Sequence, residues 1–405
     1  MAFGTPLTLQ ATSPAPSQTA VRTALPILTA LSLSHGLNDL LQSLLPAIYP
    51  NLKQDLSLSF AEIGLITLVF QVTASLLQPA VGAITDKRPQ PFSLVIGMAC
   101  SLAGLLLLSR AHAYGIVLIA AAIIGIGSSI FHPESSRVAR AASGGRFGFA
   151  QSFFQVGGNT GQAIGPLLAA LIIAPNGQGA VAWFAIVPVI GMVLLLWVGR
   201  WYADHLGERR KTAAAPAPLT RNQWIAITIL LVLVFSKNFY MASLQSFYTF
   251  YLIERFGLTI QSSQVYLFVF MFAVAAGTFF GGPLGDRFGR VPVIWISIVG
   301  VLPFSLALPF VGFGWTVALT AVIGFVMASS FPAILVYAQE LAPGRVGMIA
   351  GLFFGFAFGT GGLGAAVLGI VADHTSLDFV YRICSILPAI GVLMALMPKS
   401  EQKAI

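Results

Sequence analysis

Ionisable and amide side chains interrupt several long apolar stretches of this sequence, and the first such group is suited to carrying a proton. His35, Asp39 and Gln42 are spaced by four and three residues, so they share one face of a helix. An Asp that loses its hydration, with a His one turn away, can bind and release a proton. We expect Asp39 and His35 to do so and Gln42 to contact a bound molecule. A structural hydrogen bond from Asp39 to a neighbouring helix is the alternative.

A second ionisable group comprises His132, Glu134 and Arg137, with Pro133 among them. Glu134 and Arg137, at i and i+3 of a helix, can form an ion pair, which lowers the free-energy cost of burying each charge. Protonation of Glu134 would then release Arg137 for an anion. We expect Glu134 to take part in proton coupling, and His132 and Arg137 to take part in binding. A static ion pair that fixes helix packing is the alternative.

Four amides form a polar stripe within the apolar run from 147 to 174. Gln151, Gln155, Asn159 and Gln162 are spaced by four, four and three residues, which places them on one helical face. Amides can hydrogen-bond a substrate in either charge state. We expect Gln155 and Asn159 to bind substrate.

Lys237 is the only basic residue deep within an apolar run of the second half, and Asn238 and Tyr240 stand beside it. An anion in a central cavity would need such a point charge. We therefore expect these three residues to bind an anionic substrate. Permanent pairing of Lys237 with Asp39 is the alternative.

We expect twelve transmembrane helices to carry these groups. Of the 405 residues 57% are hydrophobic and 8% are charged, with a mean hydropathy of +0.87, whereas soluble domains contain about 25% charged residues. Only a bilayer would be a solvent for so much apolar surface. Apolar runs of about 20 residues or more predict spans at 24–50, 60–85, 92–110, 114–140, 147–174, 180–201, 224–252, 262–285, 291–311, 314–341, 346–372 and 379–398.

The distribution of basic residues predicts the orientation of these spans. Sixteen of the 21 Lys and Arg fall on the side of the two termini, and four, Lys53, Arg110, Arg255 and Arg382, fall on the other. Because Lys and Arg gather in cytoplasmic loops, both termini are expected in the cytoplasm of a bacterium, with the chain in its inner membrane. The net charge of +8 is thereby explained by topology and contact with lipid, and nucleic acid is excluded as a partner.

No motif for a cofactor, a metal ion or a catalytic centre is visible. Cys100 and Cys384 both fall in predicted helices, and no residues with metal-ligand spacing surround them. We therefore expect both to be buried structural thiols. His132 and Glu134 lack the nucleophile, base and orienting group of an enzyme site. The first twenty or so residues, rich in Thr, Ser, Pro, Ala and Gln, have the composition of a disordered tail and none of the features of a cleaved signal peptide.

The two halves of the sequence repeat one another. A shift of 200 residues aligns Gly82 to Lys87 with Gly282 to Arg287, and a shift of 199 aligns Gly145 to Gly148 with Gly344 to Gly347. Six spans separate the copies, so the halves have the same orientation, as in a transporter whose halves rock about a central site. We predict a cytoplasmic tail at 1–22, six-helix bundles at 23–201 and 223–399, a cytoplasmic linker at 202–222, and a tail at 400–405.

The repeated segment resembles a family signature. Gly282-Pro-Leu-Gly-Asp286-Arg287-Phe-Gly-Arg290 is similar to the loop signature of the major facilitator superfamily, which implies an all-α membrane fold of two pseudo-symmetric six-helix bundles. Its Asp can lie against a helix N-terminus while its basic residues meet helix C-termini and lipid phosphate. We expect a conformational latch made by Asp86, Asp286, Arg287 and Arg290; loop charge that only sets topology is the alternative.

Three segments narrow the resemblance further. Leu31 to Asp39, Gly127 to Arg137 and Gln151 to Asn159 resemble the bacterial fosmidomycin resistance transporters. The resemblance implies a monomeric carrier that exports a small phosphonate antibiotic in exchange for protons. Import or exchange of a cellular organic phosphate or carboxylate ester is the alternative within transporters, and a channel or a membrane enzyme fits the repeat less well. Gly161 to Pro166 also resembles part of a fifth-helix antiporter signature; small residues that let two helices approach are the alternative.

Overall fold

The structure is a computed structural model that describes residues 23–48, 52, 55–58, 60–173, 176–210, 217–258 and 260–398. The predicted tails at 1–22 and 400–405 lie outside these ranges. All the elements that the structure describes are helices. In the first half they are α1 (Leu25–Ala47), α3 (Phe60–Lys87), α4 (Ser93–Ser109), α5 (Tyr114–Ala142), α6 (Phe147–Leu168) with a π-helical turn (Ala169–Ile173), and a 3₁₀ helix (Gln178–Ala185) that leads into α8 (Ile186–Arg210).

The second half repeats this order of elements. It contains α9 (Arg221–Phe256), α10 (Ile260–Phe288), α11 (Arg290–Ile298), α12 (Leu302–Ala307) with a 3₁₀ turn (Leu308–Phe310), α13 (Phe313–Ala328), α14 (Ser330–Leu341), α15 (Val346–His374), and α16 (Leu377–Cys384) with a 3₁₀ helix (Leu387–Leu396). Across the described residues, nine segments are long and apolar enough to cross a membrane, and α4 is a shorter apolar helix. These ten segments, together with α1 and α6, which carry the polar stripes, correspond to the twelve predicted spans. The prediction of twelve spans is confirmed.

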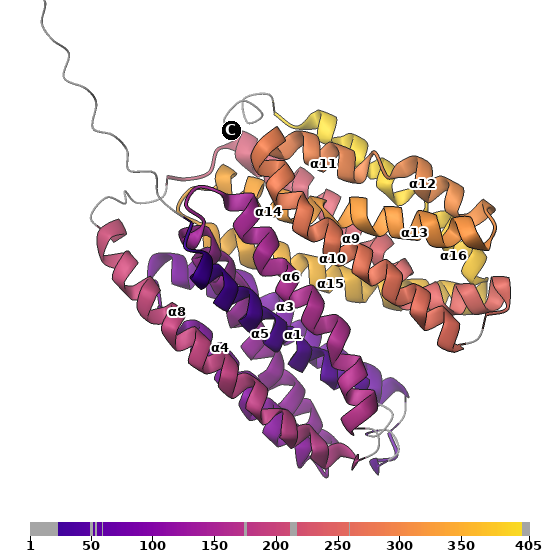
Figure 1. Cartoon of the computed structure of the whole chain (residues 1–405), viewed down its shortest axis with the longest axis horizontal. Helices are drawn as coiled ribbons and strands as arrows, with labels where there is room; N and C mark the ends of the chain where they lie inside the picture. Colours follow the sequence, from indigo (N-terminus) through magenta and orange to yellow (C-terminus); the bar gives the residue numbers. More distant parts are fainter. Residues whose placement is uncertain are drawn as a thin grey trace, which may run out of the picture.

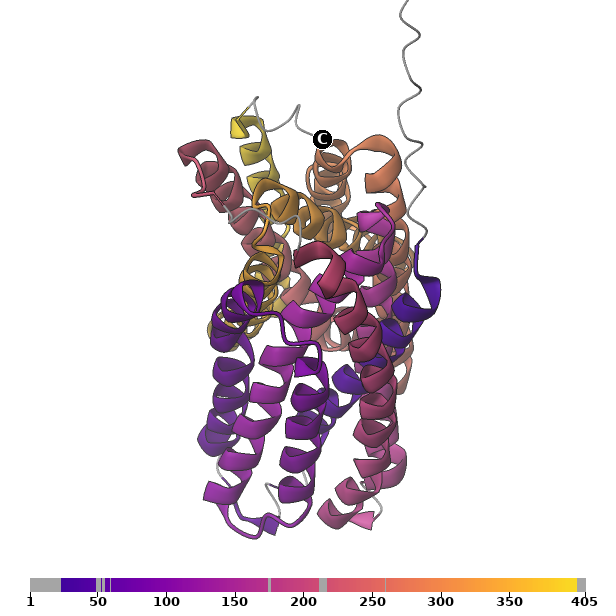
Figure 2. The same ribbon diagram turned by 90° about the vertical axis from the view of Figure 1, so that its left-hand side faces the viewer.

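The helices gather into two bundles, one for each half of the chain (Figure 1). Figure 2 shows the same division from a second direction, with the indigo to magenta helices of the first half in one bundle. Large apolar side chains such as Leu76, Leu171, Phe310 and Trp315 are about 70% exposed on the outside of these bundles. Exposure of this kind is costly in water and ordinary in lipid.

Two boundaries differ from the prediction. Helix α8 continues to Arg210 and α9 begins at Arg221, so the connection is shorter than the predicted linker at 202–222. The apolar pattern persists beyond 201, since Tyr202 is buried, and a helix that leaves the bilayer can carry charged residues. Thr220 starts α9 through a capping box with Gln223, which stabilises the first turn.

Helices α1 and α6 approach each other along a row of glycines. A Cβ atom built on Gly157 would lie 1.8 Å from the carbonyl oxygen of Ser32, and one on Gly161 would lie 2.0 Å from that of Gly36. A Cβ atom on Gly165 would lie 1.7 Å from the Ser43 hydroxyl oxygen. In the structure, the Gly161 to Gly165 segment therefore lets α6 approach α1 closely, as expected for small residues.

Replacing Gly161 by Val is expected to unfold the first bundle at a lower temperature, because a side chain would force α1 and α6 apart. We expect a loss of about 1–3 kcal/mol, as for other overpacked sites, measured as a fall in the melting temperature of the purified protein in detergent. Gly359→Val on α15 is the control, since a Cβ atom added at Gly359 would have no other atom within 4 Å. Equal melting temperatures for the two variants would contradict the close packing.

The two bundles touch closely at one end, which we call the closed end. A Cβ atom on Gly82 of α3 would lie 2.0 Å from the carbonyl oxygen of Gly347 at the start of α15. At the equivalent place of the repeat, one on Gly148 of α6 would lie 2.3 Å from the carbonyl oxygen of Gly282 of α10. In Figure 1 the bundles converge at the end where α14 and the start of α15 lie, and they diverge toward the other.

Candidate transport site

A cavity of about 750 Å³ lies between the two bundles, and residues of both line it. Seven of the residues predicted to act on protons or substrate are in its wall: His35, Asp39, Gln42, Gln155 and Asn159 from the first half, and Lys237 and Asn238 from the second. The polar faces predicted for α1 and α6 thus meet in one place.

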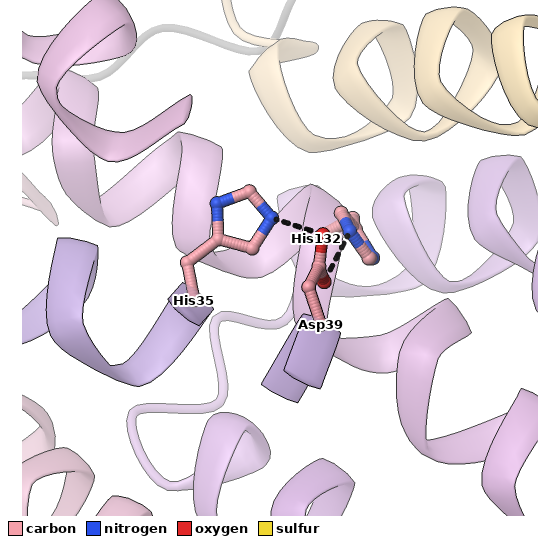
Figure 3. Close-up of side chains that lie close together, drawn as sticks. All are labelled: His35, Asp39 and His132. Carbon is pink, nitrogen blue, oxygen red and sulfur yellow. Dashed lines mark ion pairs between the residues drawn. The ribbon is translucent and has the colours of Figure 1, made fainter. Parts of the chain in front are cut away.

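His35, Asp39 and His132 form a buried cluster at the first-half wall (Figure 3). The Nε2 atom of His35 lies 3.4 Å from one carboxylate oxygen of Asp39, and the Nε2 atom of His132 lies 3.5 Å from the other. His35 and Asp39 come from adjacent turns of α1, while His132 reaches them from α5. We call these three residues the His–Asp–His cluster.

Three amides surround the Asp39 carboxylate. Asn38 and Gln42 donate to its Oδ1 atom over 3.1 and 3.3 Å, and Gln162 donates to Oδ2 over 3.0 Å. The orientation of the Gln42 amide is fixed because its oxygen accepts a hydrogen bond from the Ser128 hydroxyl at 3.0 Å. Both carboxylate oxygens are therefore hydrogen-bond acceptors in this arrangement.

Backbone carbonyls fix the tautomer of both histidines. The Nδ1 atom of His35 lies 2.9 Å from the carbonyl oxygen of Phe154, and that of His132 lies 3.0 Å from the carbonyl oxygen of Ser128. A carbonyl oxygen only accepts hydrogen bonds, so both Nδ1 atoms carry hydrogen and both Nε2 atoms face Asp39.

The same three side chains offer ligand atoms that all lie within 4.8 Å of one another, which is close enough to hold a metal ion. The sequence expectation of no metal site rested on spacing along the chain, and spacing cannot show that α5 brings His132 to α1. Within the described residues no other His, Cys, Asp and Glu side chains converge in this way.

Lys237 lies on the opposite wall of the cavity, on α9. Its side chain is buried, and its Nζ atom lies 5.1 Å from the centre of the Phe331 ring. Among the described residues no carboxylate forms an ion pair with Lys237, so the alternative pairing with Asp39 is not made in this conformation. A cation without a counter-ion in a cavity is a site for an anionic ligand.

Aromatic rings connect the His–Asp–His cluster with Lys237. His35 stacks on Phe154 at 4.0 Å, and the Phe354 ring of α15 lies 5.2 Å from His132 and 5.4 Å from Phe331. Sequence reasoning missed Phe331 and Phe354. The chain has 31 Phe residues, and no pattern distinguishes these two from the phenylalanines that face lipid.

The structure places other predicted residues away from the cavity wall. Arg137 pairs with Glu134 and donates to the carbonyl oxygen of Thr85, while Ser93 donates to Glu134 over 3.1 Å. Five residues turn an α-helix by about 140°, so Arg137 points away from the direction of His132, between α3 and α5. This arrangement matches the alternative of a static ion pair, and neither Glu134 nor Arg137 meets the cavity here.

Tyr240 also lies outside the cavity. Its ring is buried in the core of the second bundle, and its hydroxyl has no hydrogen-bond partner within the described part of the chain. Residue 240 lies about 300° around α9 from Lys237, with Met241 in the cavity wall instead. The predicted binding role of Tyr240 therefore has no support from this conformation.

Two carboxylates hold the closed end together. Asp86 accepts hydrogen bonds from the backbone N–H groups of Gly347 and Met348 at 2.9 and 2.8 Å. Asp286 accepts from those of Gly148 and Phe149 at the same two distances. Each carboxylate thus caps the first turn of a helix in the other half, where the helix dipole favours negative charge.

The basic residues of the signature behave differently from one another. Arg290 pairs with Asp286 at 2.6 Å and with Glu340 at 3.3 Å. Arg287 lies over the ring of Phe288 at 5.2 Å and makes no ion pair with the described acidic residues. Of the four predicted latch residues, Asp86, Asp286 and Arg290 therefore gather at the contact between the bundles, and Arg287 does not.

Comparisons with known proteins agree with this architecture. The family model described as Major Facilitator Superfamily matches residues 31–353 and 241–404. The Fosmidomycin resistance protein of Escherichia coli (strain K12) is 59% identical over 392 residues, which cover 96% of this chain and 97% of that protein. An uncharacterized MFS-type transporter of Bacillus subtilis (strain 168), YfnC, is 41% identical over 387 residues, 94% of each chain.

Solved structures share the fold at low identity. The transporter FucP in its outward conformation superposes with a TM-score of 0.73 and 16% identity, covering 93% of this chain and all of that one. The human organic anion transporter MFSD10 superposes with a TM-score of 0.74 and 16% identity, covering 92% and 99% of the two chains. These likenesses concern the fold alone.

Proposed function

This chain belongs to the major facilitator superfamily, and we propose that it exports small anionic phosphonates such as fosmidomycin in exchange for protons. The observation that carries the proposal is the cavity with His35 and Asp39 of the His–Asp–His cluster on one wall, and on the other Lys237, which has no carboxylate partner among the described residues. Two walls from two rocking bundles can bind two ligands that are released in turn. The close similarity to a fosmidomycin resistance protein supports the choice of substrate.

The amides that line the cavity suit a phosphonate ligand. Gln155 and Asn159 line the cavity, and the side chain of Asn159 donates to Thr278 of α10 over 3.2 Å. Amides discriminate little between charge states of the ligand, whereas Lys237 supplies a point charge for a phosphonate. Asn238 lies next to Lys237 in the wall and adds a further hydrogen-bonding group.

The closed end faces the cytoplasm in this proposal. Lys87, Arg140, Arg287 and Arg345 lie at that end, and basic residues mark the cytoplasmic side of an inner-membrane protein. The cavity is then accessible from outside, where protons are more abundant in a respiring bacterium. We propose that the protein works as a monomer, because each chain contains a complete cavity.

A pH gradient is an adequate source of free energy for this exchange. One pH unit corresponds to about 1.4 kcal/mol for each proton, which is a tenfold concentration ratio of substrate for each coupled proton. A membrane potential of 100 mV adds about 2.3 kcal/mol for each charge moved.

Uptake of fosmidomycin into inside-out membrane vesicles with an acidic lumen tests the proposal. Export from the cell corresponds to uptake into these vesicles, so we expect accumulation that grows with the pH difference and collapses when an uncoupler is added. Vesicles without the protein are the control. Accumulation that persists without the gradient would contradict proton coupling and would favour exchange or import of a cellular organic phosphate or carboxylate.

Replacing Asp86 or Asp286 by Asn is expected to shift the carrier toward opening at the closed end. An amide lacks the charge and one acceptor that the capped helix uses, which removes about 1–2 kcal/mol from the closed state. That is a five- to thirtyfold change in the ratio of the two states. Distances between spin labels on α3 and α15 measure it, and Asp204→Asn on the exposed part of α8 is the control. If the distance distribution is unchanged in both variants, Asp86 and Asp286 do not stabilise the closed end and act only as loop charges that set the topology.

A further inference from the structure

We infer that the His–Asp–His cluster is a binding site for a divalent transition-metal ion of the Zn²⁺ class, held by the Nε2 atoms of His35 and His132 and by the carboxylate of Asp39. The site goes beyond the proposed function, because metal binding is measured without a substrate and without a pH gradient. It follows from the spacing of the three ligand atoms, from two buried nitrogens without partners, and from the contacts that fix both imidazole rings.

The spacing of the three ligand atoms fits a tetrahedral ion. Zn²⁺ binds imidazole nitrogen and carboxylate oxygen at about 2.0–2.2 Å, so neighbouring ligand atoms of a tetrahedral ion lie about 3.3–3.6 Å apart. The Nε2 atoms of His35 and His132 lie 3.4 and 3.5 Å from the carboxylate oxygens of Asp39. One ligand atom from each of the three side chains lies within 4.8 Å of the other two. Small movements of the side chains would therefore close the cluster around an ion.

Both Nε2 atoms are buried without a partner. The residues His35 and His132 are only 2% and 0% exposed, and neither Nε2 atom has a hydrogen-bond partner among the described residues. Figure 3 shows both nitrogens directed at the Asp39 carboxylate. Buried polar atoms almost always have a partner, and one that lacks a protein partner calls for an ion or an ordered water. Two such nitrogens beside one carboxylate form a site for a cation.

The outer contacts of the two rings are those of metal-binding histidines. A histidine that binds a metal ion donates its other ring N–H to a carbonyl or a carboxylate, which fixes the tautomer and the orientation of the ring. The Nδ1 atoms of His35 and His132 lie 2.9 and 3.0 Å from the carbonyl oxygens of Phe154 and Ser128. His35 also stacks on Phe154 at 4.0 Å. The rings are thereby held with Nε2 toward Asp39 before an ion arrives.

The Asp39 carboxylate retains a lone pair for an ion. Its Oδ1 atom accepts hydrogen bonds from Asn38 and Gln42, whereas Oδ2 accepts one within the described part of the chain, from Gln162. Each carboxylate oxygen can accept about two hydrogen bonds, so Oδ2 has one acceptor position left. Carboxylates that bind metal ions are themselves hydrogen-bonded by outer groups, and Gln162 supplies such a bond.

The donor set selects the class of ion. Two imidazole nitrogens and one carboxylate suit Zn²⁺ and related transition metals, whereas Mg²⁺ and Ca²⁺ prefer oxygen ligands. His35 and Asp39 line the cavity, so an ion can reach the cluster from there. Three protein ligands leave a coordination position for water or for an oxygen of a bound anion. Because the proposed function uses the same carboxylate, a bound ion would have to leave before the carrier exchanges a proton.

Titration of the purified protein with Zn²⁺ tests the inference. Protein in detergent, freed of any purification tag and treated with a chelator, is titrated in a calorimeter, and we expect one bound ion per chain. Loss of an outer partner weakens metal binding about 10- to 100-fold, so loss of a ligand in His132→Gln should raise the dissociation constant for Zn²⁺ at least about 100-fold. His205→Gln is the matched control and should bind as the wild type does, because His205 is exposed on α8 and its Nδ1 atom also bonds a carbonyl one turn back.

Three outcomes of the titration would overturn the inference. They are the absence of Zn²⁺ binding to the wild type, equal affinity for Zn²⁺ in His132→Gln and the wild type, and equal binding of Mg²⁺, which would indicate a site made of oxygen ligands. None of them bears on proton coupling, which is measured separately by uptake into vesicles.

X-ray absorption at the zinc edge of the wild type provides a second test if His132→Gln folds poorly. We expect nitrogen and oxygen ligands at about 2.0–2.2 Å, with the outer scattering of two imidazole rings. A sulfur ligand at about 2.3 Å would place the ion at a cysteine, and a shell of oxygen alone would place it on carboxylates elsewhere. Either spectrum would overturn the assignment to the His–Asp–His cluster.

Discussion

Replacing Asp39 by Asn is expected to abolish the accumulation of fosmidomycin driven by a pH gradient in inside-out vesicles. The amide keeps the size of the side chain but removes the negative charge that lies 3.4 and 3.5 Å from the two histidines. Without that carboxylate, the cluster loses the acidic group that we propose to bind and release a proton. The accumulation ratio should fall from at least tenfold for each pH unit to about one.

The design of this experiment separates loss of coupling from loss of folding. Asp204→Asn makes the same chemical change at an exposed position of α8 and should accumulate substrate as the wild type does. Asp39→Glu keeps the charge and should recover part of the coupling. Full accumulation by Asp39→Asn, in amounts of protein equal to the wild type, would remove the His–Asp–His cluster from the coupling mechanism.

Patterns within one helix predicted which polar side chains share a face and line the cavity. The spacing of His35, Asp39 and Gln42 placed them on one face of α1, and the amide stripe placed Gln155 and Asn159 on one face of α6. Such periodicity is a local property of the chain. The twelve spans followed in the same way, because the bilayer requires a minimum apolar length.

Contacts between helices could not be predicted from these patterns. His132 lies 93 positions after Asp39 in the sequence, and only the packing of α5 beside α1 brings its ring to the carboxylate. Arg137 was expected to bind an anion, yet its direction on α5 is set by Glu134 and by the carbonyl of Thr85. Which of several buried polar residues on a helix faces the cavity depends on the rotation of that helix, and packing against its neighbours sets this rotation.

The division of the site between the two bundles bears on how exchange could work. The groups that we propose to bind protons all belong to the first half, and Lys237 belongs to the second. Phe354 of the second half touches His132, while Phe331 lies beside Lys237. A rocking movement of one bundle against the other would therefore change the surroundings of both binding groups together, as exchange through a single cavity requires.

Replacing Lys237 by Met is expected to weaken binding of fosmidomycin and, at the same time, to stabilise the empty protein. A hydrogen bond between charged groups contributes about 1.5–3 kcal/mol, so the dissociation constant should rise about ten- to a hundredfold. Met occupies similar space and removes a buried cation that has no carboxylate partner among the described residues, which lowers the cost of burial. The melting temperature without ligand should rise, and its further increase on adding fosmidomycin should shrink.

Lys237→Arg is the matched variant for this prediction, because it keeps the charge and changes only its shape. We expect it to retain more affinity than Lys237→Met, with a melting temperature near that of the wild type. Unchanged affinity in Lys237→Met would move the anion site away from this wall. Arg137 would then be the next basic candidate, and its side chain would first have to leave Glu134, its partner on the same helix.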